Sequence, residues 1–405
     1  MPVGIADAED ALRELRELAA SAGAKVVGAA MQRSPEPDPA TLLGRGKVNE
    51  VRTEARAARA ELVIFDHDLT PTQLRNLERI LDLKVIDRTQ IILDIFARRA
   101  RSREGQLQVE LAQLNYLLPR LSGHGTMLSR LGGGIGTRGP GEQQLEYDRR
   151  RIRRRIRHLS ESIERVRSQR ALHRAHRRAQ NLHTVALVGY TNAGKSTLFN
   201  ALTSAAVETS ARMFATLDPT VRAMPLGGQG TALLSDTVGF IRRLPTHLVA
   251  AFRATLEELD DARLLVHVTD ASDPERAAQD AAVEVLLQDL GVGATPRLHV
   301  WNKLDRLDPA ERGKFESDAA SVTVSALTGE GLENLRQRIA HEVTTDPVVE
   351  ADFDFAAGDG KRLSLVYRFG TILSTCYEAD RVRVTARVPA SLRTRLTECQ
   401  PEVPA

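Results

Sequence analysis

A short apolar run followed by a loop rich in glycine and lysine constrains the fold of this chain most strongly. The run is Thr184–Val188 (TVALV), and the loop Gly189–Thr197 (GYTNAGKST) fits the pattern G-x-x-x-x-G-K-[ST]. Its glycines let backbone N–H groups turn inward around phosphate oxygens, and the dipole of the next helix, expected at Lys195–Thr203, points its positive end at the same anion. A strand before the loop and a helix after it therefore predict a phosphate-binding P-loop.

Strand and helix patterns continue to alternate after this loop. Further strands are expected at Thr231–Leu234, Leu264–Thr269, Arg297–Val300 and Ser321–Val324, and a helix at Arg276–Leu290. Such alternation predicts an α/β fold whose doubly wound, mostly parallel sheet spans residues 181–345.

The N-terminal part repeats this alternation on a smaller scale. We expect helices at 6–22, 47–60 and 71–81, and strands at 25–31, 61–66 and 83–87. Residues 1–96 are therefore predicted to form a small α/β domain.

Two apolar stripes predict a helical hairpin over residues 97–180. Their members are Leu107, Leu111, Leu114, Leu118 and Leu121, and then Ile152, Ile156, Leu159, Ile163 and Val166. Steps of four and three place each set on one helix face. The glycine-rich segment 122–141 is expected to be the loop of this hairpin; a second nucleotide site and a plain flexible linker are the alternatives.

The last segment, 346–405, predicts a small α+β domain. Strand patterns occur at 362–367 and 381–388, and a helix is expected at 370–376.

Charge is divided unequally along the chain. Residues 1–180 contain 33 Lys and Arg against 23 Asp and Glu, whereas residues 181–405 contain 23 against 30. The densest basic run consists of Arg149, Arg150, Arg151, Arg153, Arg154, Arg155 and Arg157. Because these arginines repel one another unless a polyanion lies near, we predict that they contact RNA together with Arg130 and Arg138; a solvated helix face is the alternative.

Membrane and secretion signals are not expected. No apolar run reaches the ~18–20 residues of a membrane span, and the N-terminus lacks the basic-then-apolar pattern of a secretory signal. The two cysteines, Cys376 and Cys399, have no metal-ligand spacing. We expect a monomeric protein of the reducing cytoplasm, with peripheral membrane association as the alternative location.

The choice of base is predicted from Asn302-Lys303-Leu304-Asp305 (NKLD). The Asp305 carboxylate is able to accept from both N1–H and the 2-amino group of guanine, whereas adenine lacks both donors and would leave it unpaired. Asn302 is expected to serve the other edge of the base, and the stem of Lys303 to pack on the ring. Backbone N–H groups facing the guanine O6 are expected from Ser325, Ala326 and Leu327.

A magnesium site is predicted beside the phosphates. Ser196 and Thr216 are the expected direct ligands, with the nearby Thr209 and Thr220 as alternatives to Thr216. Asp236 is expected to hold Mg²⁺ through water, and the Gly239 N–H is expected to contact the γ-phosphate. The predicted GTP-binding residues are Gly189, Tyr190, Thr191, Asn192, Ala193, Gly194, Lys195, Ser196, Thr197, Phe214, Ala215, Thr216, Leu217, Asp218, Asp236, Thr237, Val238, Gly239, Asn302, Lys303, Leu304, Asp305, Ser325, Ala326 and Leu327.

The catalytic residue that positions water is not identifiable from the sequence. Lys195, Thr216 and Gly239 are expected to stabilise the transition state, but Phe240 stands where many regulatory GTPases place a glutamine. Slow intrinsic turnover is therefore predicted. Asn192 is similar to the pattern of potassium-stimulated GTPases, so K⁺ near the phosphates is a second prediction; the alternative is that Asn192 only caps the loop.

Taken in order, the motifs resemble the HflX family of ribosome-associated GTPases. The resemblance rests on 132–150 (GGGIGTRGPGEQQLEYDRR), 214–220 (FATLDPT) and 236–259 (DTVGFIRRLPTHLVAAFRATLEEL), with an echo at 43–48 (LGRGKV), and covers nearly the whole chain. It implies binding to the large ribosomal subunit and its RNA through the N-terminal domain and the hairpin, and splitting or rescue of stalled ribosomes under stress. A ribosome-assembly GTPase, an RNA-remodelling ATPase and a binding module that does not hydrolyse GTP are the alternatives.

Overall fold

The computed structural model divides the chain into two compact units. Residues 1–225 and 231–332 form the first unit, and residues 226–230 and 333–405 form the second. The structure describes residues 5–32, 36–121, 140–179, 183–203, 213–226, 231–242, 259–315, 317–318, 320–344, 348–356, 358–378, 381–389, 392–393 and 396.

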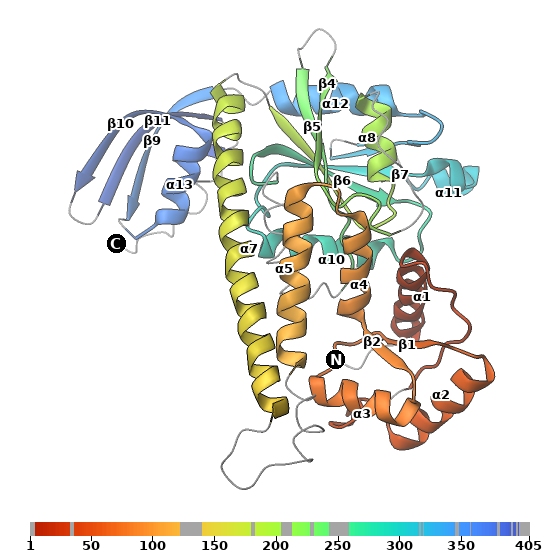
Figure 1. Cartoon of the computed structure of the whole chain (residues 1–405). Coiled ribbons are helices and arrows are strands. Elements are labelled where there is room, and N and C mark those ends of the chain that lie inside the picture. Colours follow the sequence, from red (N-terminus) through yellow and green to blue (C-terminus); the bar gives the residue numbers. More distant parts are fainter. Residues whose placement is uncertain are drawn as a thin grey trace, which may run out of the picture. The chain divides into compact units, whose positions relative to one another are not determined.

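A six-stranded sheet forms the centre of the first unit (Figure 1). Its strands, in spatial order, are β4 (Thr220–Pro225), β5 (Thr231–Asp236), β3 (Thr184–Val188), β6 (Ala262–Asp270), β7 (Arg297–Asn302) and β8 (Ser321–Thr323). All neighbours are parallel except β4 and β5, which pair antiparallel. The predicted α/β fold class with a mostly parallel sheet is confirmed, although the edge strand β4 was not predicted from the sequence.

Helices follow the strands as the alternation predicts. They are α8 (Lys195–Thr203), α10 (Arg276–Asp289), the 3-10 helix η3 (Leu304–Arg306) and α11 (Pro309–Arg312). Every residue of β3 is buried, which explains why its sequence is continuously apolar rather than alternating.

The N-terminal elements of the first unit surround a two-stranded parallel sheet. In chain order they are α1 (Ile5–Ser21), α2 (Arg45–Ala57), β1 (Leu62–Phe65), α3 (Pro71–Leu81), β2 (Lys84–Asp87) and α4 (Arg88–Arg99). The expected strand at 25–31 is wrong. Val26 and Val27 are exposed there, and β1 and β2 pair only with each other among the described residues, so this segment buries no valine side chain and has no partner strand.

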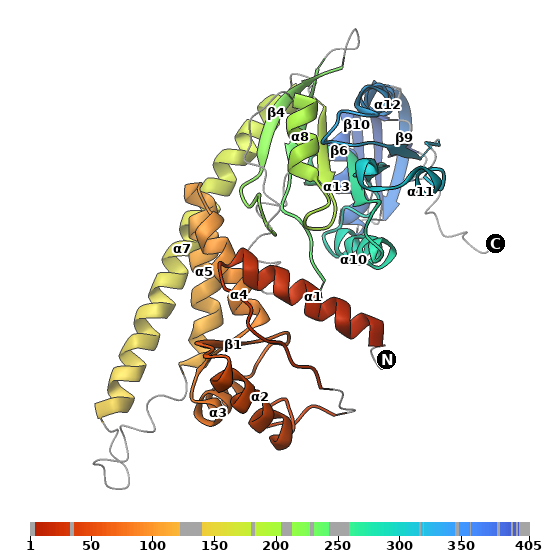
Figure 2. The same cartoon turned by 90° about the vertical axis from the view of Figure 1, so that its right-hand side faces the viewer.

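The predicted helical hairpin is present as α5 (Arg103–Arg120) and α7 (Pro140–Ala179), which run side by side (Figures 1 and 2). Leu159 of α7 is completely buried in their seam. A second face of α5, with Val109, Ala112 and Tyr116, is buried in the main core of the unit. The hairpin is therefore anchored along α5, whereas the expected RNA contacts Arg130 and Arg138 lie outside the described residues.

The second unit contains α12 (Leu332–Thr344, whose first residue belongs to the first unit), β9 (Val348–Ala356), α13 (Gly360–Phe369), β10 (Thr371–Glu378) and β11 (Arg381–Pro389). Its strands form an antiparallel sheet in the order β10-β11-β9. The alternating exposed and buried residues of β11 explain why this strand was predictable.

Two elements of this unit were predicted with the wrong type. The expected strand at 362–367 is helix α13, because the Asp359 carboxylate accepts from the Arg362 N–H and caps the helix, and Val366 is buried on its inner face. The expected helix at 370–376 is strand β10, because pairing with β11 outweighs a weak local preference.

The part of the chain that the structure describes contains no helix that combines the length and the apolar character needed to cross a membrane.

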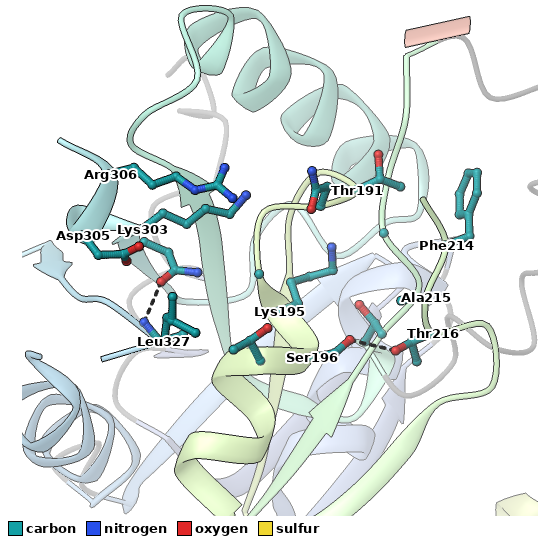
Figure 3. Close-up of a pocket in the computed structure, with 17 residues that line it drawn as sticks. Thr191, Lys195, Ser196, Phe214, Ala215, Thr216, Lys303, Asp305, Arg306 and Leu327 are labelled. Carbon is teal, nitrogen blue, oxygen red and sulfur yellow. Dashed lines mark hydrogen bonds between the residues drawn. The ribbon is translucent and has the colours of Figure 1, made fainter. Parts of the chain in front are cut away.

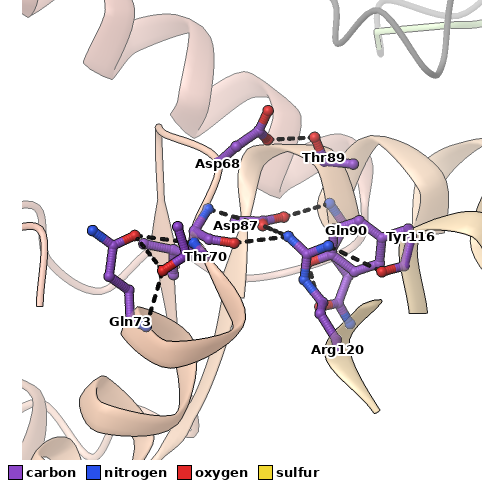
Figure 4. Close-up of polar contacts among 9 residues, drawn as sticks. Asp68, Thr70, Gln73, Asp87, Thr89, Gln90, Tyr116 and Arg120 are labelled. Carbon is purple, nitrogen blue, oxygen red and sulfur yellow. Dashed lines mark hydrogen bonds and ion pairs between the residues drawn. The ribbon is translucent and has the colours of Figure 1, made fainter. Parts of the chain in front are cut away.

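Buried polar contacts fix α5 to the N-terminal elements (Figure 4). Asp87 is fully buried; one carboxylate oxygen accepts from the Gln90 N–H (2.9 Å), and the other accepts from the Leu69 N–H (3.2 Å) and from the Arg120 guanidinium (2.9 Å). Arg120 also donates to the Leu69 carbonyl (2.8 Å) and lies 3.5 Å from the centre of the Tyr116 ring. This one guanidinium therefore joins the end of α5 to the caps of two neighbouring segments.

We expect Arg120→Ala to lower the free energy of opening of this region by about 3–5 kcal/mol, because it leaves the buried Asp87 carboxylate without its counter-charge. Hydrogen–deuterium exchange of peptides from 84–99 and 103–120 measures this. Arg103→Ala, an exposed change on the same helix, should leave exchange nearly unaltered, and equal protection in both variants would contradict the assigned role.

Candidate nucleotide-binding site

The carboxyl ends of the parallel strands and the loops after them surround a cavity of about 250 Å³ (Figure 3). The lining residues are Thr191, Asn192, Gly194, Lys195, Ser196, Thr197, Phe214, Ala215, Thr216, Thr237, Gly239, Asn302, Lys303, Asp305, Arg306, Ala326 and Leu327. Every segment that the sequence singled out for nucleotide binding contributes to it. Arg306 also lines the cavity but was not predicted as a binding residue, although its position directly after NKLD could have indicated it.

Close packing explains two glycines of the site. Gly194 has a φ of +94°, and a Cβ there would lie 2.3 Å from the Asn302 amide nitrogen. A Cβ on Gly239 would lie 2.8 Å from Thr191 Cγ2 and 3.0 Å from the Lys195 ammonium. The segment 236–239 can therefore approach the P-loop this closely only because residue 239 has no side chain.

Lys195 is held by backbone carbonyls inside the cavity. Its ammonium donates to the carbonyls of Gly189 (3.0 Å) and Tyr190 (2.7 Å), and the residue is 6% exposed. Burial lowers the pKa of Lys195 to about 8, although nearby Asp236 favours the charged form. Negative charge entering the cavity would stabilise the ammonium, as phosphate groups do.

An oxygen cluster lies beside the lysine. The Ser196 and Thr216 hydroxyls are 2.8 Å apart, and both donate to the same carboxylate oxygen of Asp236, at 2.7 and 2.8 Å. The other Asp236 oxygen is buried and has no hydrogen-bond partner among the described residues, and burial raises the pKa of this carboxyl group. Hydroxyl and carboxylate oxygens are the ligands that Mg²⁺ prefers, so these residues fit the ion expected from the sequence.

The segment after Asp236 forms a short extension of the sheet along the P-loop. The Thr191 N–H donates to the Phe240 carbonyl (2.7 Å), and the Phe240 N–H donates to the Gly189 carbonyl (3.1 Å). Phe240 is 3% exposed and belongs to the main core. Its ring therefore stabilises this extension and does not face the cavity.

The NKLD residues occupy the opposite end of the cavity. The Asn302 amide donates to the Ala193 carbonyl (2.9 Å) and accepts from the Ala326 N–H (3.0 Å), so it ties the P-loop to the loop after β8. Asp305 accepts from the Ser325 hydroxyl (2.5 Å). Asn302 thus joins two protein loops, a role that the sequence alone did not indicate.

Lys303 adopts a left-handed backbone conformation at the end of β7, with a φ of +64°. Its ammonium pairs with Asp270 (2.6 Å) at the end of the neighbouring strand. The ion pair fixes the tip of the side chain, so the aliphatic stem is left to line the cavity.

Nine of the predicted binding residues do not line the cavity. They are Gly189, Tyr190, Ala193, Leu217, Asp218, Asp236, Val238 and Ser325, together with the buried Leu304 of η3. Asp236 and Ser325 still act on it through Ser196, Thr216 and Asp305.

Segment 214–218 faces in two directions. Thr216 points toward Ser196, whereas the Phe214 ring packs edge-on against Phe96 of α4, with centroids 4.7 Å apart. Asp218 accepts from the N–H groups of Arg101 (2.8 Å) and Ser102 (2.7 Å), and so binds the residues at the start of α5. The segment therefore joins the nucleotide cavity to the helical hairpin.

A second connection runs from the P-loop to α1 and α4. The Tyr190 hydroxyl contacts Glu14 and accepts from the Arg242 N–H (2.8 Å). Arg88, which is 4% exposed, pairs with Glu14 and Asp66 and donates to the Arg242 carbonyl (2.9 Å). A shift of residues 240–242 would disturb this buried ion pair.

Comparison with known proteins agrees with the geometry. Three family models match in succession: "GTP-binding GTPase N-terminal" at residues 9–97, "GTP-binding GTPase Middle Region" at 99–177 and "50S ribosome-binding GTPase" at 184–303. The chain is 45% identical over 388 residues to the GTPase HflX of Caldanaerobacter subterraneus subsp. tengcongensis, covering 96% of this chain and 90% of that relative. It is 43% identical over 399 residues to the GTPase HflX of Escherichia coli, covering 98% and 93%.

We expect Asn302→Ala to weaken nucleotide binding by about 10- to 100-fold, because two hydrogen bonds of roughly 1 kcal/mol each hold the loops together. Titration with a fluorescent GDP analogue measures this. Asn302→Asp keeps the acceptor for the Ala326 N–H and loses the donor to the Ala193 carbonyl. Its nucleotide affinity should therefore lie between those of the unaltered protein and of Asn302→Ala. Unchanged affinity in the alanine variant would show that the bridge is dispensable.

Proposed function

The chain belongs to the HflX family of GTPases, and from this premise we propose that it acts on the large ribosomal subunit and splits or rescues stalled ribosomes. The observation that carries the proposal is the connection from the GTP cavity through residues 214–218 to the arginine-bearing hairpin. Such a partner implies action in the cytoplasm, and we propose that the protein acts there as a monomer.

We propose that the cavity holds GTP with its phosphates at the P-loop and its base at NKLD. The Asp305 carboxylate, oriented by Ser325, would accept from guanine N1–H and the 2-amino group. Lys195 would neutralise the β- and γ-phosphates. Mg²⁺ would be held by the Ser196 and Thr216 hydroxyls and would offset the charge of the β- and γ-phosphates.

The state of the γ-phosphate would reach the hairpin through a short backbone segment. Thr216 lies at the proposed metal position, and Asp218, two residues later, binds the N–H groups at the start of α5. A Cβ on Gly105 would lie 2.3 Å from the Asp218 carboxylate, so this contact is closely packed. Movement of Thr216 on hydrolysis would therefore loosen the contact of Asp218 with α5.

The arginines of α7 supply the proposed RNA-binding surface. Ile152, Ile156 and Leu159 occupy the stripe toward α5, so the arginines at 149–157 cover the remaining faces. Their repulsion is partly relieved, because Arg155 makes a two-pronged ion pair with Glu110 (2.7 and 2.8 Å) and Arg150 lies 3.5 Å from Glu146. The solvent-exposed Arg151, Arg154 and Arg157 are the group that we propose contacts phosphates.

Hydrolysis would require a contribution from outside the chain. Phe240 is in the core and cannot orient water, so we propose that the ribosome completes the site. The exposed Asn192 lines the cavity in a left-handed conformation with a φ of +63°, and we propose that it binds K⁺ close to the phosphates.

Base recognition is tested by Asp305→Asn. We expect GTP affinity to fall by about 10- to 100-fold, since a hydrogen bond to a charged group is worth ~1.5–3 kcal/mol. Affinity for xanthosine triphosphate should rise, because the Asn amide donates to the xanthine 2-carbonyl. Competition binding with the two nucleotides measures the ratio; a variant that still prefers GTP would sink the assignment.

The ribosomal role is tested by GTP turnover with purified large subunits. We expect stimulation of at least about tenfold, because groups that complete other GTPase sites contribute ~10³–10⁵. Stimulated turnover should be faster in K⁺ than in Na⁺, and Asn192→Ala should remove that difference.

Control variants and different subunit preparations in the same turnover assay distinguish the proposed function from its alternatives. Asp218→Asn should lower the stimulated rate relative to the basal rate, whereas Asp308→Asn, an exposed change outside the cavity, should not. Stimulation by precursor subunits alone would favour a role in assembly, and equal rates with and without subunits would refute the proposal. Equal rates in K⁺ and Na⁺ would remove only the potassium site.

A further inference from the structure

A cluster of two histidines and one aspartate lies outside the nucleotide cavity, where α10 covers β6 and β7. His267 of β6 and His299 of β7 are directly paired in the parallel register, and their rings stack with centroids 4.9 Å apart and an interplanar angle of 4°. Asp280 of α10 approaches both rings. Three elements that are distant in sequence thus bring two imidazoles and one carboxylate together.

The spacing of these groups suits a single metal ion. His267 Nε2 lies 3.2 Å from one Asp280 oxygen, His299 Nε2 lies 3.7 Å from the other, and one ligand atom from each residue lies within 4.8 Å of the others. Ligands about 2.0–2.1 Å from a tetrahedral Zn²⁺ lie about 3.3–3.4 Å apart. Small side-chain rotations would therefore complete the coordination.

A buried polar atom without a partner points to a missing ligand. His267 is 8% exposed, and its Nε2 lies 3.2 Å from an Asp280 oxygen but makes no hydrogen bond of normal geometry among the described residues. An unsatisfied buried polar atom costs about 1–3 kcal/mol.

Thr269 supplies the supporting contact that metal sites commonly contain. Its hydroxyl donates to the Asp280 carboxylate (2.6 Å) and lies 2.9 Å from His299 Nε2. A hydroxyl in this position orients the carboxylate.

We propose that His267, Asp280 and His299 form a structural site for Zn²⁺ or a similar late first-row divalent ion. Two imidazoles and a carboxylate suit such an ion, whereas Mg²⁺ and Ca²⁺ take oxygen ligands. Water fills the fourth position, because Asp280 and His299 are partly exposed. The bound ion clamps α10 to β6 and β7, whose ends carry Asp270 and Asn302.

Trp301 provides an internal probe, because it is the single tryptophan of the chain and its ring lies 4.1 Å from that of His299. The full-length, metal-stripped protein is saturated with Mg²⁺ and GDP and titrated with Co²⁺. We expect one equivalent to quench Trp301 fluorescence and to give the intense visible band of four-coordinate Co²⁺, and Zn²⁺ to displace it.

The isosteric variant Asp280→Asn should weaken Co²⁺ and Zn²⁺ binding by at least about tenfold while GDP binding is retained. His299→Gln is the second variant, and its Zn²⁺ content is measured by elemental analysis. His158→Ala, an exposed histidine on α7, is the matched control and should bind as the unaltered protein does.

Three results would overturn the proposal. They are failure of the unaltered protein to bind one equivalent, equal affinity in Asp280→Asn, and a Co²⁺ signal that appears only when Mg²⁺ and GDP are left out, which would assign the ion to the nucleotide site. The readouts do not involve ribosomes or turnover, so they are independent of the ribosomal proposal.

Discussion

Two opposite charges buried at the carboxyl ends of β3 and β5 govern the arrangement of the nucleotide site. Lys195 and Asp236 are almost completely buried, and each is stabilised mainly by groups of the same small region: carbonyls for the ammonium, hydroxyls for the carboxylate. Removing such charges from water costs several kcal/mol each, so the surrounding backbone must be held accurately. Gly194 and Gly239 allow the neighbouring segments to pack closely because they have no side chain. Asn302 holds this packing in place by joining the P-loop to the loop after β8.

The same requirement explains why the N-terminal elements and the sheet share one core. A segment that moves by a small amount at the phosphates has an effect elsewhere only if its other side is packed against something. Thr216 and Asp218 show this for residues 214–218, where one side reaches the oxygen cluster and the other reaches α5. Arg88 does the same for residues 240–242, because a buried guanidinium with two acidic partners tolerates little displacement. Both connections use ordinary hydrogen bonds and ion pairs, so the coupling requires no further element.

The sequence predicted those features whose cause is local. A strand of continuous apolar residues, a glycine-lysine loop and an alternating strand such as β11 each carry their own signal. The prediction of element type was wrong within residues 360–378, because the type of each element there depends on its partners. Helix α13 depends on the Asp359 cap and its buried face, and strand β10 depends on pairing with β11. Asp218 shows the same limit in the site. Its place in a recognisable motif suggested a nucleotide contact, yet its carboxylate binds α5, and only the tertiary packing of α5 reveals that.

The histidine cluster follows a different logic from the nucleotide site. Near the carboxyl ends of the strands, Ser196, Thr216 and Asp236 present only oxygen, which suits a hard cation that exchanges with the nucleotide. His267 and His299, which do not line the cavity, present nitrogen at paired positions of the neighbouring strands β6 and β7. A β-sheet places paired residues on the same face, so a histidine on each of two neighbouring strands makes half of a metal site without any loop. One aspartate on the covering helix is enough to complete the donor set. The proposed site therefore needs all three residues, and Asp280 is the one that helix α10 contributes.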